Sequence, residues 1–259
     1  MNKIEQTFQG KKAFVAFLTG GDPDIETTEQ LILVMADEGV DIVEIGIPFS
    51  DPIAEGPVIQ EADERALAAG CTVDKLFAMV GRLRGKVSIP LLFMTYINPI
   101  FVYGKEKFLD NCAACGIDGL IVPDLPFEER DELAPLCAAH GVTLISMVAP
   151  TSQDRVERIA KNAEGFLYCV SSLGVTGTRS ELNTHIDDII TQVRAVSGVP
   201  CAIGFGISTP EQAAAMAALS DGIIIGSAIE KLIAAGGRDS EQPVRQFLRS
   251  VRETLDGIG

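Results

Sequence analysis

Eight short apolar runs, rich in β-branched residues, alternate along this chain with stretches of helical periodicity. The runs lie at 13–18, 41–46, 89–95, 118–122, 142–147, 166–170, 200–204 and 222–225. Strands that are buried on both faces read as continuous apolar runs, and strands that alternate with helices form parallel sheets. Eight such units in a chain of about 250 residues predict a closed (β/α)₈ barrel, with an open doubly wound sheet as the alternative.

The ends of the expected helices carry the residues that start and stop helices. Gly39, Gly116 and Gly141 each stand between a helical stretch and the next apolar run, as left-handed helix stops do. Ile4 and Phe8 are spaced for a short amphipathic helix ahead of the first run. After the eighth run we expect an extra helix at 227–235 before the last helix at 241–256. No Pro-, Gly- or Ser-rich linker divides the chain, so we expect one domain over residues 1–259.

Two connections are longer than the others, and both follow the carboxyl end of a run. They hold residues 47–70 and residues 174–181. In a (β/α)₈ barrel the active site lies at that end of the strands. We therefore expect these two connections to act as lids over the site.

The charge balance excludes some classes of partner. The chain has 36 acidic and 21 basic residues and a net charge of −15, so it should repel nucleic acids and anionic membrane surfaces. An anionic substrate must then be held by local backbone donors. The first ten residues lack the apolar segment of a signal peptide, and no apolar run reaches the length of a membrane span. With six cysteines that do not form a disulfide pattern, a cytoplasmic protein is expected.

The candidate acid–base residue is Glu44, which lies in an otherwise apolar strand. Because side chains alternate along a strand, Glu44 points into the barrel if Val43 and Ile45 pack on the helices. Burial would raise the pKa of Glu44 toward neutrality, as proton transfer requires. The alternative is a structural glutamate that is hydrogen-bonded to its neighbours. Asp51 and Glu55 in the next connection are either solvated or a second carboxylate of the same site.

Three glycine-rich turns follow the last three runs, at 174–177, 204–206 and 226–227. Glycines let backbone N–H groups approach an anion, and barrels often bind phosphate after strands 7 and 8. These turns predict a phosphate site, unless the glycines serve only tight turns.

Other chemistry is disfavoured by the residues. Cys112 and Cys115 have CxxC spacing but lack the second pair that a zinc site needs, so we expect no metal site. Ser50 and Ser227 have no evident histidine partner for a hydrolase triad, and no lysine lies in a strand to form a Schiff base. A cleavage reaction in this chain would depend on proton transfer.

Six motifs, in order along nearly the whole chain, resemble the tryptophan synthase alpha subunit family. They are FLTGGDP at 17–23, EIGIPFSDP at 44–52, PDLP at 123–126, GVTG at 174–177, GFGIS at 204–208 and GSAI at 226–229. The resemblance implies a (β/α)₈ barrel that cleaves indole-3-glycerol phosphate to indole and glyceraldehyde 3-phosphate in tryptophan biosynthesis. It also implies a beta-subunit partner in an alpha2-beta2 heterotetramer. No cofactor is expected in this chain, since pyridoxal phosphate belongs to the beta partner.

The resemblance assigns roles by position. Glu44 matches the acid–base glutamate, and Glu55 the second carboxylate, for which the family commonly has aspartate in an Asp-Gly-Pro sequence. Glutamate keeps the charge and adds one methylene of reach. The other implied contacts to the substrate are Phe17, Tyr168 and Phe205 at the indole ring and Gly177, Gly206, Gly226 and Ser227 at the phosphate. Thr176 matches the lid threonine that orients the catalytic carboxylate. The implied partner contacts are Pro48, Asp51 and Pro126.

Two other functions remain open at this point. Glu44 and the glycine turns also fit another barrel enzyme that acts on a phosphorylated sugar, such as an isomerase. The chain could also be a non-catalytic activating subunit. The PFSDP segment favours the lyase over the isomerase, and the two retained carboxylates argue against the activating subunit.

Overall fold

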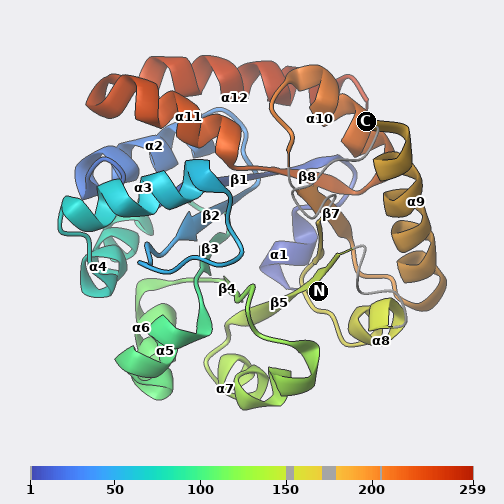
Figure 1. The fold of residues 1–259 in the computed structure, drawn as a ribbon, viewed down its shortest axis with the longest axis horizontal. Helices are drawn as coiled ribbons and strands as arrows, with labels where there is room; N and C mark the ends of the chain where they lie inside the picture. The colour runs from blue at the N-terminus through green and yellow to red at the C-terminus, as the bar shows by residue number, and fades with distance from the viewer. Residues whose placement is uncertain (1, 150–154, 171–178, 205, 259) are drawn as a thin grey trace.

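The computed structural model describes residues 2–149, 155–170, 179–204 and 206–258. Eight strands close into a barrel in chain order, with parallel pairing throughout and β8 beside β1 (Figure 1). The strands are β1 (Ala13–Thr19), β2 (Ile42–Gly46), β3 (Leu91–Met94), β4 (Gly119–Ile121), β5 (Thr143–Val148), β6 (Leu167–Val170), β7 (Cys201–Gly204) and β8 (Gly222–Ile225). The predicted (β/α)₈ barrel is confirmed, and the open sheet is wrong.

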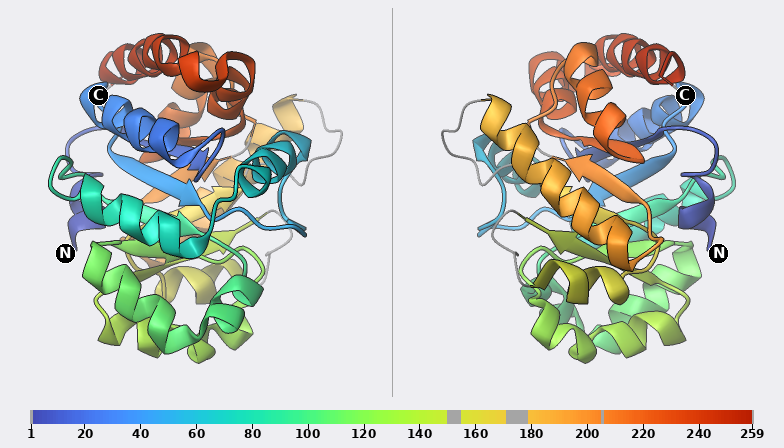
Figure 2. Two further views of the ribbon diagram at one scale, coloured as in Figure 1. Left: turned by 90° about the vertical axis from the view of Figure 1, so that its left-hand side faces the viewer. Right: turned by 90° about the vertical axis from the view of Figure 1, so that its right-hand side faces the viewer.

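Helices surround the barrel on the sides seen in Figure 2. They are α1 (Lys3–Gln6), α2 (Ile25–Asp37), α3 (Pro57–Ala68), α4 (Val73–Leu83), α5 (Ile97–Tyr103), α6 (Lys105–Cys115), η1 (Phe127–Glu132), α7 (Ala134–Ala139), α8 (Val156–Lys161), α9 (Arg179–Val196), α10 (Pro210–Leu219), α11 (Ser227–Gly236), η3 (Gly237–Asp239) and α12 (Glu241–Asp256). The short leading helix and the extra helix after β8 are both present. Gly39, Gly116 and Gly141 have φ values of 81°, 87° and 69°, as helix stops should.

Alternate residues of the strands form two separate parts of the core. Val15, Ile42 and Tyr168 belong to the cluster inside the barrel, while Val43 belongs to the layer between strands and helices. Ile4 of α1 packs with the interior cluster, so the leading helix closes the amino-terminal end of the barrel. The opposite end, where the strands finish, is left for the site.

The long connection at 47–70 is only partly a loop. Its second half forms α3, which begins at Pro57 after Gly56 and buries Ile59, Ala62 and Ala66 on one face. Proline in the first turn of a helix is favourable because its missing N–H would have no partner there. The expected lid is therefore the shorter segment 47–56. In the other long connection, residues 174–178 lie outside the described residues.

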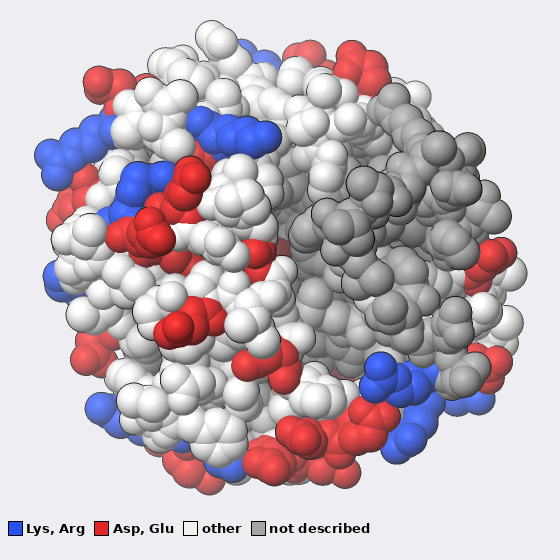
Figure 3. All heavy atoms as spheres, in the orientation of Figure 1, with Lys and Arg blue, Asp and Glu red and all other residues white. Residues whose placement is uncertain are grey.

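The surface carries acids and bases side by side. Figure 3 shows lysine and arginine side chains interspersed with aspartate and glutamate over the described part of one face. Ion pairs account for some of this pattern, since Arg82 and Lys86 lie 2.7 and 2.9 Å from the carboxylate of Glu29. Within the described ranges, no helix is long and apolar enough to cross a membrane.

Candidate active site

Glu44 is buried inside the barrel and has no hydrogen-bond partner in the described part of the chain. It lies on β2, in register with Phe17 of β1 and Leu92 of β3, and its side chain is 0 % exposed. Neither carboxyl oxygen has a hydrogen-bond partner among the described residues. Burial raises the pKa of Glu44 to about 8, because the charged form would lose its hydration. The carboxyl group is therefore protonated at neutral pH and able to give a proton and take one back.

Glu55 is held over this end of the barrel by Tyr96. The Tyr96 hydroxyl donates to Glu55 Oε2 and accepts the N–H of Ala54 at 2.8 Å. The Tyr96 ring also packs against Phe49, with 5.4 Å between centroids. Burial raises the pKa of Glu55, the Tyr96 hydrogen bond opposes that rise, and the nearby Asp124 adds to it. Asp51, by contrast, is exposed and accepts a 2.6 Å hydrogen bond from Ser50.

Tyr96 and Asp63 are two residues of this region that the sequence reasoning missed. Asp63 lies on the buried face of α3, 5 % exposed, where it accepts the Phe49 N–H. Burial and the nearby Glu55 raise the pKa of Asp63 to about 7. The available signal was its spacing, since Asp63 stands four residues after Ile59 and three before Ala66, on an apolar stripe.

Two aromatic side chains line the barrel interior near the carboxyls. Burial raises the pKa of the Tyr168 hydroxyl, and the neighbouring carboxyls of Glu44 and Glu55 would raise it further when ionised, so Tyr168 lies close to both acids. The ring of Phe17 fills the space beside two glycines. A Cβ on Gly46 would lie 2.7 Å from that ring, and a Cβ on Gly226 would lie 3.1 Å from it. The structure therefore brings Phe17 and Tyr168 together with Glu44, while Phe205 lies outside the described residues.

The glycine turns after β7 and β8 lie at the same end of the barrel. Gly226 caps α11, and Ser227 is its first residue, so the N–H groups of that first turn have no partners within the helix. Gly206 has a φ of 77°, a conformation that favours glycine, and no atom lies within 4 Å of where a Cβ would be. This arrangement can receive an anion by backbone donors and the helix dipole. Thr176 and Gly177 lie outside the described residues.

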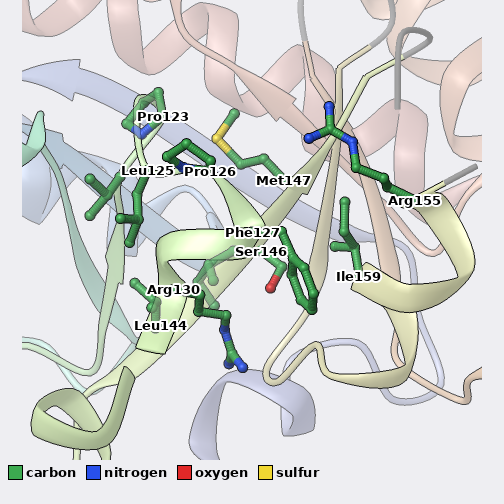
Figure 4. Close-up of a pocket in the computed structure, with 12 residues that line it drawn as sticks. Pro123, Leu125, Pro126, Phe127, Arg130, Leu144, Ser146, Met147, Arg155 and Ile159 are labelled. Carbon is green, nitrogen blue, oxygen red and sulfur yellow. The ribbon is translucent and has the colours of Figure 1, made fainter. Parts of the chain in front are cut away.

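The residues expected at a partner surface differ in exposure. Asp51 and Pro126 are exposed, whereas Pro48 is buried. Pro126 lines a cavity of about 150 Å³ that also contacts Arg130 and Arg155 and that lies beside the connections after β4 and β5 (Figure 4). Glu44 and Glu55 are not part of its lining. In the described part of the chain, no group of three or more His, Cys, Asp or Glu side chains has an arrangement that could hold a metal ion.

Comparison with known proteins agrees with this geometry. Residues 4–258 match the family model described as tryptophan synthase alpha chain. The chain is 44% identical over 256 residues to the tryptophan synthase alpha chain of Lacticaseibacillus casei, covering 99% of this chain and 96% of the relative. A crystal structure of tryptophan synthase subunit alpha from Legionella pneumophila str. Paris matches with a TM-score of 0.90 and 37% identity over 100% of both chains. A chain of M. tuberculosis tryptophan synthase in its aminoacrylate-bound form matches with a TM-score of 0.88 and 28% identity, over 98% of this chain and 100% of that one. With the barrel, the buried glutamate and these matches in agreement, the chain belongs to the tryptophan synthase alpha chain family and acts in tryptophan biosynthesis.

Proposed function

We propose that this chain is a lyase that cleaves indole-3-glycerol phosphate to indole and glyceraldehyde 3-phosphate. The observation that carries the proposal is Glu44, a fully buried carboxyl with no partner among the described residues, between aromatic side chains at the open end of the barrel. Burying a carboxyl without a hydrogen bond lowers the stability of the fold. A catalytic role accounts for a carboxyl that is kept at this position despite that cost.

In the proposed reaction Glu44 moves two protons. Its carboxyl gives a proton to C3 of the indole ring, and positive charge develops at the ring nitrogen. The resulting carboxylate takes the proton of the hydroxyl on the carbon attached to C3. The bond between these two carbons breaks, its electron pair returns to the ring, and the aldehyde forms. Glu44 ends protonated, as it began, so it turns over without a cofactor in this chain.

The other proposed residues hold the substrate around Glu44. Glu55, positioned by Tyr96, stabilises the positive charge at the indole N–H, and Thr176 helps to orient it. Phe17, Tyr168 and Phe205 flank the ring. Gly177, Gly206, Gly226 and Ser227 bind the phosphate through backbone and hydroxyl donors, which a chain with a net charge of −15 requires.

We also propose a beta-subunit partner, in an alpha2-beta2 assembly in the cytoplasm, with pyridoxal phosphate held by the partner. Pro48, Asp51 and Pro126 lie on the connections proposed to face it. Two large apolar side chains support this surface, since Ile53 is 82% exposed and Val102 is 81% exposed. Ile53 belongs to the same connection as Asp51, and exposed apolar side chains of this size favour a partner interface.

One assay tests the reaction. The purified chain is mixed with indole-3-glycerol phosphate, and indole is followed with and without a beta subunit. The lyase predicts indole release by the chain alone and its loss in Glu44→Gln. An isomerase would consume the phosphate ester without releasing indole, and an activating subunit would release none without its partner; either result contradicts the proposal.

A further inference from the structure

Glu230 is a second fully buried acid that the proposed reaction does not use. It lies in the first turns of α11, the helix whose amino-terminal residues Gly226 and Ser227 form part of the proposed phosphate site. Its side chain is 0 % exposed, between the buried residues Ile229 and Ile233. A buried carboxyl on this helix needs a role that offsets the loss of its hydration.

One oxygen of Glu230 joins α11 to the end of β1. Oε1 accepts the backbone N–H of Thr19 at 2.5 Å, and both groups are buried. Thr19 is the last residue of β1 and lies two residues beyond Phe17, the ring that packs on Gly226. The hydrogen bond therefore fixes the distance between the phosphate helix and the strand that carries an indole-pocket residue.

The other oxygen of Glu230, Oε2, is buried without a hydrogen-bond partner among the described residues, and Asp22 lies near this carboxyl. Asp22 is 0 % exposed and accepts two hydrogen bonds from Arg65, at 2.9 and 2.7 Å. The backbone N–H of Asp22 donates to the carbonyl of Thr19 at 3.3 Å, so Thr19 connects Glu230 to Asp22. Glu230 has no positive partner in direct contact among the described residues. Burial and the nearby charge of Asp22 both raise the pKa of Glu230, to about 8, so its carboxyl is protonated at neutral pH.

Arg65 carries the chain of contacts on to α3. That helix begins two residues after Glu55, and it packs against α11 (Figure 1). Glu230, Asp22 and Arg65 thus connect α11, the end of β1 and α3, the helix that follows Glu55.

We propose that Glu230 is a positioning residue that, through Thr19, Asp22 and Arg65, holds the phosphate-binding turn of α11 in register with α3 and Glu55. This inference rests on the proposed function, because it assumes a phosphate at Gly226 and Ser227. The role is one of geometry, so an uncharged side chain that accepts the same hydrogen bond from Thr19 should replace glutamate.

The test compares Glu230→Gln with Glu230→Val in the full chain. Glutamine keeps an oxygen that can accept the Thr19 N–H, whereas valine has a similar volume but no acceptor. We expect Glu230→Gln to keep the KM for indole-3-glycerol phosphate and the Kd for glycerol 3-phosphate within about twofold, and Glu230→Val to raise both by about tenfold. In Glu230→Val, kcat at saturating substrate should fall less than KM rises.

A second variant keeps the test decisive if Glu230→Val fails to fold. Arg65 is partly exposed, with 35% of its side chain accessible, so Arg65→Met should fold. Arg65→Met removes the ion pair between Arg65 on α3 and Asp22, and we expect it also to weaken glycerol 3-phosphate binding. Adding Glu230→Val to Arg65→Met should then have little further effect, because both act on one unit.

Glu38→Val is the matched control. Glu38 is a partly buried acid, with 8% of its side chain accessible, that joins two other helices, α2 and α12, through Arg245 at 2.7 Å and Arg249 at 2.9 Å. It should lower the melting temperature without changing the Kd for glycerol 3-phosphate. Unchanged binding in Glu230→Val and Arg65→Met, or equal loss in Glu230→Gln and Glu230→Val, overturns the inference. If the unmutated chain neither binds glycerol 3-phosphate nor releases indole, the proposed function itself is wrong.

Discussion

Replacing Glu44 by glutamine should abolish activity and, at the same time, stabilise the fold. Glutamine keeps the size and the neutral polar character of the protonated side chain but cannot transfer the proton. The wild-type carboxyl is buried without a hydrogen bond among the described residues. In the unfolded chain it is in water and ionises readily, so at pH values where it would be ionised there, its burial lowers the free energy of unfolding.

The size of this effect follows from the pKa of Glu44. Its value of about 8 in the folded chain lies above the 4.5 of an ordinary glutamate, so the folded state binds the proton more tightly. Stability contributed by the protonated form is complete below pH 4.5 and is lost as the pH rises toward 8. The cost to the wild type is about 1 kcal/mol at pH 5 and about 4 kcal/mol at pH 7.5. Because glutamine does not titrate, the advantage of Glu44→Gln should grow by about 3 kcal/mol between these pH values.

Urea unfolding followed by circular dichroism at pH 5 and pH 7.5 measures this difference, with indole release recorded on the same preparations. Glu253→Gln provides the control, since it makes the same chemical change at an exposed position on α12. A stability gain that is equal at both pH values would refute the reasoning about a protonated, buried Glu44. Normal indole release by Glu44→Gln would remove its catalytic role.

Three further changes test the surroundings of Glu44. Tyr96→Phe keeps the ring contact with Phe49 but removes the hydrogen bond to the Glu55 carboxylate. A hydrogen bond to a charged group is worth about 1.5–3 kcal/mol, so kcat should fall roughly 10- to 100-fold. An unchanged kcat would mean that Tyr96 does not position Glu55. Glu55→Asp shortens the side chain that meets Tyr96, and we expect a drop in kcat of about tenfold, whereas full turnover would show that the loop adapts. Gly226→Ala brings a methyl group to 3.1 Å from the Phe17 ring, so the Kd for glycerol 3-phosphate, measured by calorimetry, should rise severalfold; equal affinity would place the phosphate elsewhere.

The strands and the direction of Glu44 were predictable because they depend on local periodicity. All eight apolar runs became strands with ends within two residues of the prediction, and the parity of Ile42, Val43 and Glu44 placed the carboxylate inside the barrel. A buried parallel strand has a strong signature of its own, and a single charged residue in it stands out.

The environment of Glu55 could not be predicted, because it depends on which distant residues the fold brings to it. The residues by themselves left Glu55 and Asp51 as two similar loop carboxylates, and only the family resemblance assigned Glu55 to the site and Asp51 to the partner surface. The structure separates them: Glu55 meets Tyr96, 41 residues away, whereas Asp51 stays in water with Ser50. Helix α3 was missed for a related reason, since its apolar face includes the polar Asp63, which weakens the helical pattern.

The buried acids also explain how a chain with a net charge of −15 can receive an anion. Burial raises the pKa of Glu44 and Glu230 to about 8 and that of Asp63 to about 7, while Asp22 is paired with Arg65. At neutral pH Glu44 and Glu230 are therefore mostly protonated and Asp63 is about half protonated, which reduces the negative charge at this end of the barrel. A lysine or arginine placed beside Glu44 to hold the phosphate would lower the pKa of that carboxyl and remove the proton that the reaction needs. Backbone N–H groups at a helix terminus attract phosphate through partial charges only, so they can hold the substrate and leave Glu44 protonated.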